Sequence, residues 1–170
     1  MTLNKLVAFV FIIILCTSCT KKKNDKTNDV QSQLVDFEKE KLAILETLHN
    51  ETKAAFKRDY KSWQNHWVHD STISKTYINF VDNSFSESIG WSEISGFVKT
   101  FIEEHPEPEP IPELVKDIEV RLYHKAAWVT YEQQDSLRGL KRETRLMEKS
   151  NGTWRIAGMH TTIYGSKRQK

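Results

Sequence analysis

The sequence predicts an α+β fold in which a curved antiparallel sheet wraps around helices packed on one of its faces. Two helical patterns, one strand and a third helical pattern come first, and a run of antiparallel strands follows them. Two of the late strands are joined by Asn151-Gly152, the dipeptide that most strongly favours a tight hairpin turn. Helices and strands that are segregated along the chain in this way are typical of α+β proteins.

The chain begins with the features of an exported protein. Lys5 precedes the apolar run of residues 6–15, which is about half the length that a membrane-spanning helix needs. Two small polar residues lead to Cys19, and this junction resembles a bacterial lipoprotein signal, although Cys16 stands where such signals usually carry an aliphatic residue. The resemblance implies cleavage of residues 1–18 and lipid on Cys19; an ordinary secretory signal and a retained anchor are the alternatives. We therefore expect an exported lipoprotein anchored at a membrane, on the periplasmic side or at the cell surface.

The composition excludes several classes of function. Both cysteines, Cys16 and Cys19, lie in the signal region, so the folded part can hold no disulfide, no thiolate zinc site and no catalytic cysteine. The formal net charge is only +2, which gives no basis for nucleic-acid binding by bulk electrostatics. The histidines are spread over separate segments without the spacing of metal ligands, and we expect no metal and no cofactor.

The segments after the signal are a tether and two helices. Residues 19–35 hold the lipidated cysteine and then mainly polar side chains with little to bury, which is typical of a flexible tether. Apolar residues recur at helical spacing over residues 36–58. Asp59 can cap a second, shorter helix that carries Trp67 and ends at residues 69–71.

A strand, a turn and a third helix follow. Residues 72–80 alternate and are rich in β-branched and aromatic side chains, as in a strand, and residues 82–84 are turn formers. A third amphipathic helix begins after Gly90. The alternating prolines of residues 106–112 keep that segment extended. Further strands are then predicted at residues 117–123, 126–136, 142–149 and 153–164.

Several short motifs occur in a definite order along the chain. Glu143-Thr144-Arg145 is followed by Gly152-Thr153-Trp154-Arg155-Ile156 and then by His160. Upstream, Arg58-Asp59-Tyr60 precedes a Trp-bearing helix, and Gly90-Trp91 opens the third helix. In this order the motifs resemble nuclear transport factor 2-like domains, most closely the SnoaL-like branch and the association domain of calcium/calmodulin-dependent kinases.

This resemblance has structural and functional implications. It implies that residues 36–165 form a cone, in which a strongly curved antiparallel sheet closes over three helices and leaves a pocket at the open end. Residues 166–170 would follow the domain as a basic tail. It also implies the dimers through the outer sheet face that are frequent in the family, so a homodimer is one expected assembly. The functions of the family range from isomerases, dehydratases and cyclases to scaffolds, so the fold alone assigns no activity.

Strand parity predicts which side chains line the pocket. A two-residue turn at Asn151-Gly152 pairs Lys149 with Trp154, Met147 with Ile156 and Arg145 with Gly158. It puts Arg145 and His160 on the same face as Trp154. Because Trp154 is apolar, that face is expected to be the interior. We therefore expect a ligand site that comprises Trp67, Tyr77, Tyr131, Gln133, Arg145 and His160.

Each charged side chain of this predicted site needs either a partner of opposite charge or a chemical role. A buried arginine without a partner costs several kcal/mol, so Arg145 is expected to pair either with Glu143 or with the carboxylate or carbonyl of a ligand. In the ketosteroid isomerases of the superfamily a carboxylate early in the first strand takes the substrate proton, and an ungapped alignment places Lys75 there. A lysine cannot act as a base unless burial lowers its pKa strongly, so classical isomerase chemistry is disfavoured.

We therefore expect a membrane-anchored, non-catalytic protein that binds a small amphipathic ligand with a carboxylate or carbonyl group. One alternative is a SnoaL-like isomerase or dehydratase in which His160 or Lys75 is the general base. The other is a structural or partner-binding lipoprotein whose cone is filled by its own side chains, with Trp63, Trp67 and Trp154 closing the interior. The sequence leaves the question of enzymatic activity open.

Overall fold

The computed structural model describes residues 23–165 of the chain, except for residues 114, 116 and 136–138. The chain divides into two compact units, residues 1–39 and residues 40–170. The described residues form, in order, α1 (Lys23–Phe56), α2 (Tyr60–Gln64), β1 (Ser74–Asn79), β2 (Ser84–Ile89), α3 (Gly90–Glu104), β3 (Glu119–Tyr123), β4 (Ala126–Asp135), β5 (Gly139–Ser150) and β6 (Thr153–Ile163).

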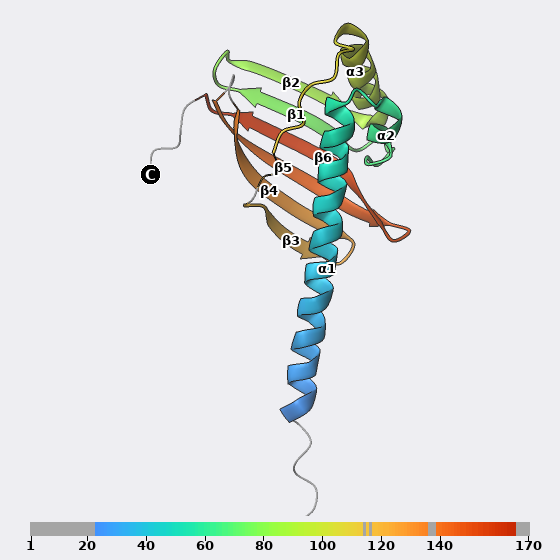
Figure 1. Ribbon diagram of the computed structural model, residues 1–170, viewed down its shortest axis with the longest axis vertical. Coiled ribbons are helices and arrows are strands. Elements are labelled where there is room, and N and C mark those ends of the chain that lie inside the picture. Colours follow the sequence, from blue (N-terminus) through green and yellow to red (C-terminus); the bar gives the residue numbers. More distant parts are fainter. Residues whose placement is uncertain (1–22, 114, 116, 136–138, 166–170) are drawn as a thin grey trace, which may run out of the picture. The chain divides into compact units, whose positions relative to one another are not determined.

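The strands of the second unit form one six-stranded sheet in the order β2-β1-β6-β5-β4-β3 (Figure 1). The neighbouring strands run antiparallel except β1 and β6, which pair in parallel. The helices α2 and α3 lie beside the part of the sheet that β1 and β2 form (Figure 1). The predicted α+β fold with a curved sheet is thus confirmed, with the difference that the sheet is mixed at the β1–β6 pair.

The first helix is longer than the sequence pattern predicts. It begins at Lys23, inside the segment expected to be a flexible tether up to residue 35. Neither glycine nor proline occurs between Lys23 and Phe56, so no residue there strongly disfavours a helix. Cys19, the signal peptide (residues 1–18) and the basic tail (residues 166–170) lie outside the described residues. None of the helices that are described combines the length and apolar character needed to traverse a bilayer.

The second helix is capped as predicted but is shorter than expected. The carboxylate of Asp59 accepts hydrogen bonds from the backbone N–H of Ser62 at 2.9 Å and from its hydroxyl at 2.6 Å. The helix then ends at Gln64 rather than at residues 69–71. The chain leaves it because residues 66–68 join the sheet: the Val68 N–H donates to the Ile156 carbonyl, and the Ile156 N–H donates to the His66 carbonyl.

The β2 strand was not predicted from the sequence. Residues 84–89 were expected only to follow a turn, but they pair along their whole length with β1. Because β2 is the edge strand of the sheet and nearly all of its side chains are exposed, it has no buried face to produce a clear apolar alternation. The other predicted strands are confirmed within a few residues at their ends.

The core of the second unit lies between the helices and one face of the sheet. We call this sheet face the inner face. Its side chains are buried at alternate positions of β5 and β6, as expected for a sheet with one covered face. Among the described residues, the largest fully buried apolar side chains are Ile44, Trp63, Trp67, Ile94, Val129, Met147 and Ile156.

Candidate functional site

Three rows of side chains cross the inner face from β1 through β6 and β5 to β4. Strand pairing sets each row, because residues that face one another across neighbouring strands point to the same side of the sheet. The first row is Lys75, Met159, Arg145 and Val129. The second is Tyr77, Thr161, Glu143 and Tyr131. The third is Asn79, Ile163, Lys141 and Gln133.

Arg145 is buried and paired with Glu143, which confirms the internal ion pair as one of the two predicted arrangements. Nη2 and Nε of Arg145 lie 2.7 Å and 3.2 Å from Oε2 of Glu143. The same carboxylate oxygen accepts a 2.7 Å hydrogen bond from the Tyr131 hydroxyl. The other carboxylate oxygen lies 3.1 Å from Nζ of Lys141.

These contacts keep the carboxylate of Glu143 ionised. Burial by itself would raise the pKa of Glu143, but the positive charges of Arg145 and Lys141 outweigh it. The net result is a pKa lowered to about 2. Burial also raises the pKa of Tyr131 well above its ordinary value, so the phenol stays protonated and donates to Glu143.

Two buried polar atoms of this cluster lack partners. Among the described residues, neither Nη1 of Arg145 nor Oγ1 of Thr161 finds a hydrogen-bond partner. Arg145 is 5% exposed and Thr161 is 1% exposed, so bulk water does not replace the missing partner. A guanidinium nitrogen can only donate, so Nη1 of Arg145 needs an acceptor such as a carboxylate or carbonyl oxygen, whereas the hydroxyl of Thr161 can donate or accept.

Lys75 lies in the first row, where the sequence placed it as a candidate base. Its side chain is buried, with Nζ 4.5 Å from the ring centroid of Phe97 and 5.4 Å from that of Tyr77. Burial lowers the pKa of Lys75 to about 8, and the positive charge of Arg145 acts in the same direction. The carboxylates of Glu51 and Glu143 oppose this lowering.

Trp67 belongs to the core and does not line a ligand site, contrary to expectation. It is 1% exposed and packs against Trp63 with ring centroids 5.6 Å apart. Both indole N–H groups donate to Oε1 of Glu51, at 2.8 Å from Trp63 and 3.2 Å from Trp67. Sequence reasoning missed the buried Glu51. Its position three residues after Leu48, on the apolar stripe of α1, is the signal that could have revealed it.

His160 lies on the outer face of the sheet, so its predicted place in the interior is wrong. Lys149 and Met147 pair with Trp154 and Ile156 as predicted, but the register then shifts between Met147 and Leu146. At this point β6 has one extra residue, so Ile156 and Ala157 are both buried. Beyond it, each side chain of β6 points to the face opposite to the one predicted. Gly158 therefore faces Leu146. Arg145 pairs with Met159, and the exposed His160 pairs with Thr144.

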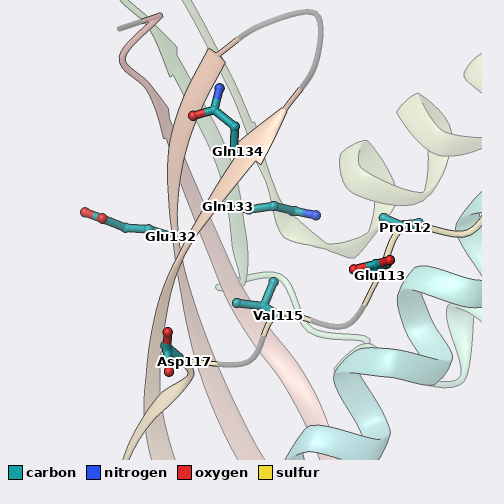
Figure 2. Close-up of a pocket in the computed structure, with 7 residues that line it drawn as sticks. All are labelled: Pro112, Glu113, Val115, Asp117, Glu132, Gln133 and Gln134. Carbon is teal, nitrogen blue, oxygen red and sulfur yellow. The ribbon is translucent and has the colours of Figure 1, made fainter. Parts of the chain in front are cut away.

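A shallow pocket lies at another place, between β4 and the segment that precedes β3. It has a volume of about 350 Å³. Of the predicted ligand residues it contains Gln133, whose side chain points toward Pro112 and Glu113, whereas Glu132 points to the other side of the strand (Figure 2). The lining residues are Pro112, Glu113, Val115, Asp117, Glu132, Gln133 and Gln134. No group of three or more metal-ligating side chains occurs in the described part of the chain.

The predicted site residues are thus only partly brought together. Tyr77, Tyr131 and Arg145 share the two adjacent inner rows with Lys75 and with Thr161. Gln133 lies in the third row and reaches the separate pocket. Trp67 and His160 lie apart from these rows. The candidate site is therefore the cluster of Lys75, Thr161, Glu143 and Arg145, which we call the inner polar cluster.

Solved structures with the same fold were found by comparison. An NTF2-like protein of unknown function from Shewanella oneidensis aligns at 18% identity with a TM-score of 0.51, covering 71% of this chain and 96% of that one. A cystatin-like fold protein from Burkholderia xenovorans aligns at 17% identity with a TM-score of 0.56, covering 72% and 89%. An NTF2-like protein of unknown function from Silicibacter pomeroyi aligns at 11% identity with a TM-score of 0.55, covering 75% and 98%.

No protein-family profile matches the chain, and no curated protein matches it. At identities this low, the likeness to the solved structures shows a shared fold and assigns no activity.

Proposed function

We propose that this protein, whose fold is that of the NTF2-like proteins, is a membrane-tethered and non-catalytic binder of a small amphipathic ligand with a carboxylate or carbonyl group. The ligand oxygen would lie at the inner polar cluster, beside Arg145 and Thr161. The observation that carries the proposal is the pair of buried polar atoms, Nη1 of Arg145 and Oγ1 of Thr161, that have no partner among the described residues.

The energetics of burial support an acceptor at this position. A buried donor without a partner loses about 1–3 kcal/mol relative to one that is hydrogen-bonded. A ligand oxygen that accepted from both atoms would recover part of this loss for each. Arginine is also the side chain best suited to hold a carboxylate through more than one hydrogen bond.

The local charge supports an anionic ligand. The cationic side chains at the cluster are Lys75, Lys141 and Arg145, and the carboxylates that act on them are Glu51 and Glu143. The cations outnumber the carboxylates by one, so a single additional negative charge would balance the cluster. The rings of Tyr77 and Tyr131, in the second row, would contact the apolar part of an amphipathic ligand.

Replacing Thr161 with valine tests the proposal in two ways. In the ligand-free protein, Thr161→Val should raise the free energy of unfolding by about 1 kcal/mol, because a hydroxyl without a partner is replaced by a methyl of similar size. In the wild type, phenylpropionate should raise the melting temperature, and phenylpropanol, which lacks the carboxylate, should not. Thr161→Val should reduce the shift that phenylpropionate produces. Thermal unfolding monitored by tryptophan fluorescence measures both effects.

Thr162→Val is the matched control, because Thr162 is the next residue on β6 and points to the opposite face. It should leave the shift with phenylpropionate unchanged. An equal shift in all three proteins would place the binding elsewhere and contradict the proposal. A loss of stability in ligand-free Thr161→Val would mean that the hydroxyl has a partner, which would remove the observation on which the proposal depends.

We also propose that lipid on Cys19 tethers the protein to a membrane, which is an interpretation of the sequence alone. Cys19→Ser should move the protein from the membrane fraction to the soluble fraction, because lipid chains supply the binding energy at about 0.8 kcal/mol per buried CH₂. Cys16→Leu is the control, because it removes the other cysteine and places an aliphatic residue at a position where such signals usually carry one, and it should stay in the membrane fraction. Fractionation followed by immunoblotting measures the distribution. Membrane retention of Cys19→Ser would contradict lipidation at that residue.

A partner-binding protein with a filled interior is the second candidate, because Trp63, Trp67 and Trp154 are each 2% exposed or less. The predicted homodimer through the outer sheet face belongs to this candidate, and Trp128 and Leu146 are exposed there. Catalysis in which His160 and Lys75 act together on one atom is disfavoured, because the two residues lie on opposite faces of the sheet. Native mass spectrometry would separate a bound small molecule from a dimer.

A further inference from the structure

Lys75 is placed differently from an ordinary surface lysine. Its ammonium group lies against two aromatic rings, those of Phe97 on α3 and Tyr77 on the same strand. The side chain of Phe97 is itself 48% exposed, so Nζ of Lys75 lies next to a surface side chain rather than in the centre of the core. The side chain of Lys75 is therefore shielded from water, although its ammonium group lies near the protein surface.

Burial favours a reactive amine at Lys75, because it disfavours the charged form of the side chain, and it outweighs the carboxylates of Glu51 and Glu143, which favour the ammonium. Arg145, in the same row and separated from Lys75 only by Met159, disfavours a second positive charge nearby. Together with burial, this lowers the pKa of Lys75 to about 8. At neutral pH the fraction of neutral amine is then on the order of a hundredfold larger than for an exposed lysine. Desolvation and a neighbouring cation are the two ways in which proteins activate lysine as a nucleophile.

We propose that Nζ of Lys75 forms a reversible imine with the carbonyl carbon of a short oxo acid whose carboxylate is held by Arg145 and Thr161. This inference rests on the proposed function, because it takes its ligand from the same class and adds the position of the carbonyl. It assigns to the inner polar cluster a covalent capture step rather than simple binding.

The step balances with no further reactant. The neutral amine attacks the carbonyl carbon and gives a carbinolamine, and loss of the hydroxyl with a proton releases one water and leaves a C=N bond. No electrons are gained or lost, and added water reverses the reaction. The carboxylates of Glu51 and Glu143, which act electrostatically on Lys75, stabilise the cationic form of the imine.

The spacing of the strands suits a short ligand. Lys75 and Arg145 lie on strands that are separated by one strand, so their Cα atoms are about 10 Å apart. Both side chains are long and extend from the same face of the sheet. A ligand that reaches both residues would therefore be a molecule in which few carbon atoms separate the carbonyl from the carboxylate.

Reductive trapping tests the proposal on the whole protein. Phenylpyruvate with sodium borohydride should add one reduced ligand to the protein, and peptide mapping should find it on Lys75. Lys99 is the internal control, because its Nζ also lies over a ring, at 5.0 Å from the centroid of Tyr60, but the residue is exposed. The labelling rate of Lys75 should clearly exceed that of Lys99, because burial favours the neutral amine at Lys75.

Two variants separate the roles of the residues. Lys75→Arg keeps the positive charge but cannot form an imine, so the trapped product should be lost while phenylpropionate still stabilises the protein. Thr161→Val should slow trapping of phenylpyruvate but not of benzaldehyde, which has no carboxylate.

The outcomes distinguish this inference from the proposed function. If phenylpropionate stabilises the protein but phenylpyruvate labels Lys75 no faster than Lys99, the imine is overturned and the binding proposal stands. If phenylpropionate does not stabilise the protein, the proposed function fails, and the oxo acid assignment fails with it. Preferential labelling of Lys75 that Thr161→Val slows supports the inference.

Discussion

Replacing Glu143 with glutamine should lower the free energy of unfolding by about 3–5 kcal/mol, because it leaves a buried guanidinium without its counter-charge. The carboxylate of Glu143 receives hydrogen bonds from Arg145 and from the hydroxyl of Tyr131, and it lies 3.1 Å from the ammonium of Lys141. A glutamine has only one acceptor oxygen, and its NH₂ group would face one of these donors. Denaturant unfolding at neutral pH measures the loss.

Acid should remove this difference between the two proteins. The pKa of Glu143 is lowered from its ordinary value of 4.5 to about 2, so the folded protein binds fewer protons at this group than the unfolded chain does. Its contribution to stability is therefore complete above pH 4.5 and is lost as the pH falls toward 2. A shift of this size corresponds to about 3 kcal/mol. The stabilities of wild type and Glu143→Gln should converge over that range.

Glu148→Gln is the matched control, because Glu148 lies on the same strand but is exposed. It should change stability by no more than about 0.5 kcal/mol. A Glu143→Gln variant that is as stable as wild type would show that the carboxylate contributes little to the fold. The pairing with Arg145 would then not be the structural ion pair that we describe.

The fold was predictable because local patterns agree with it. The cap at Asp59, the turn at Asn151-Gly152 and the strands from residue 119 onward each follow from short-range sequence features. The β2 strand was not predictable from apolar alternation, since an exposed edge strand buries no face. The early start of α1 was not predictable either, because a polar segment without glycine or proline fits a helix and a coil alike.

The candidate site was predictable only up to the point where the pairing register of β5 and β6 shifts, between Met147 and Leu146. Lys149 and Met147 face Trp154 and Ile156 as the turn dictates, and Arg145 is buried as expected. Beyond that point the extra residue in β6 reverses the parity, which moves His160 outside and Thr161 inside. A bulge leaves no clear mark in a single sequence, although the small residues Ala157 and Gly158 stand where it occurs.

The buried partners of polar side chains are the other feature of the site that the sequence predicts incompletely. The sequence predicts Glu143 as a partner for Arg145, but it does not predict the burial of Glu51, because a carboxylate in an amphipathic helix is usually assigned to the exposed face. Its burial depends on two indole N–H groups that come from residues 12 and 16 positions later. Such a long-range hydrogen bond is visible only once the helix and the tryptophans are placed against one another.

Lys75→Met should raise the free energy of unfolding at pH 7 by about 1–3 kcal/mol, which is the second large effect that we expect. Burial lowers the pKa of Lys75 from 10.5 to about 8, so at pH 7 the folded protein holds a charge that the site disfavours. Methionine has a similar length and needs no hydrogen bond. Denaturant unfolding of both proteins across the alkaline range measures the effect.

The pH dependence gives the sign of this effect independently. Between pH 8 and 10.5 the unfolded chain binds more protons at Lys75 than the folded protein does, so the stability of the wild type rises with pH. The advantage of Lys75→Met should therefore be largest below pH 8 and should disappear near pH 10.5. Lys99→Met, at an exposed lysine, is the control and should change stability at pH 7 by no more than about 0.5 kcal/mol. If Lys75→Met is instead less stable than wild type at pH 7, the ammonium is needed to balance Glu51 and Glu143. Lys75 would then be a structural cation and not a lysine with a reactive neutral amine.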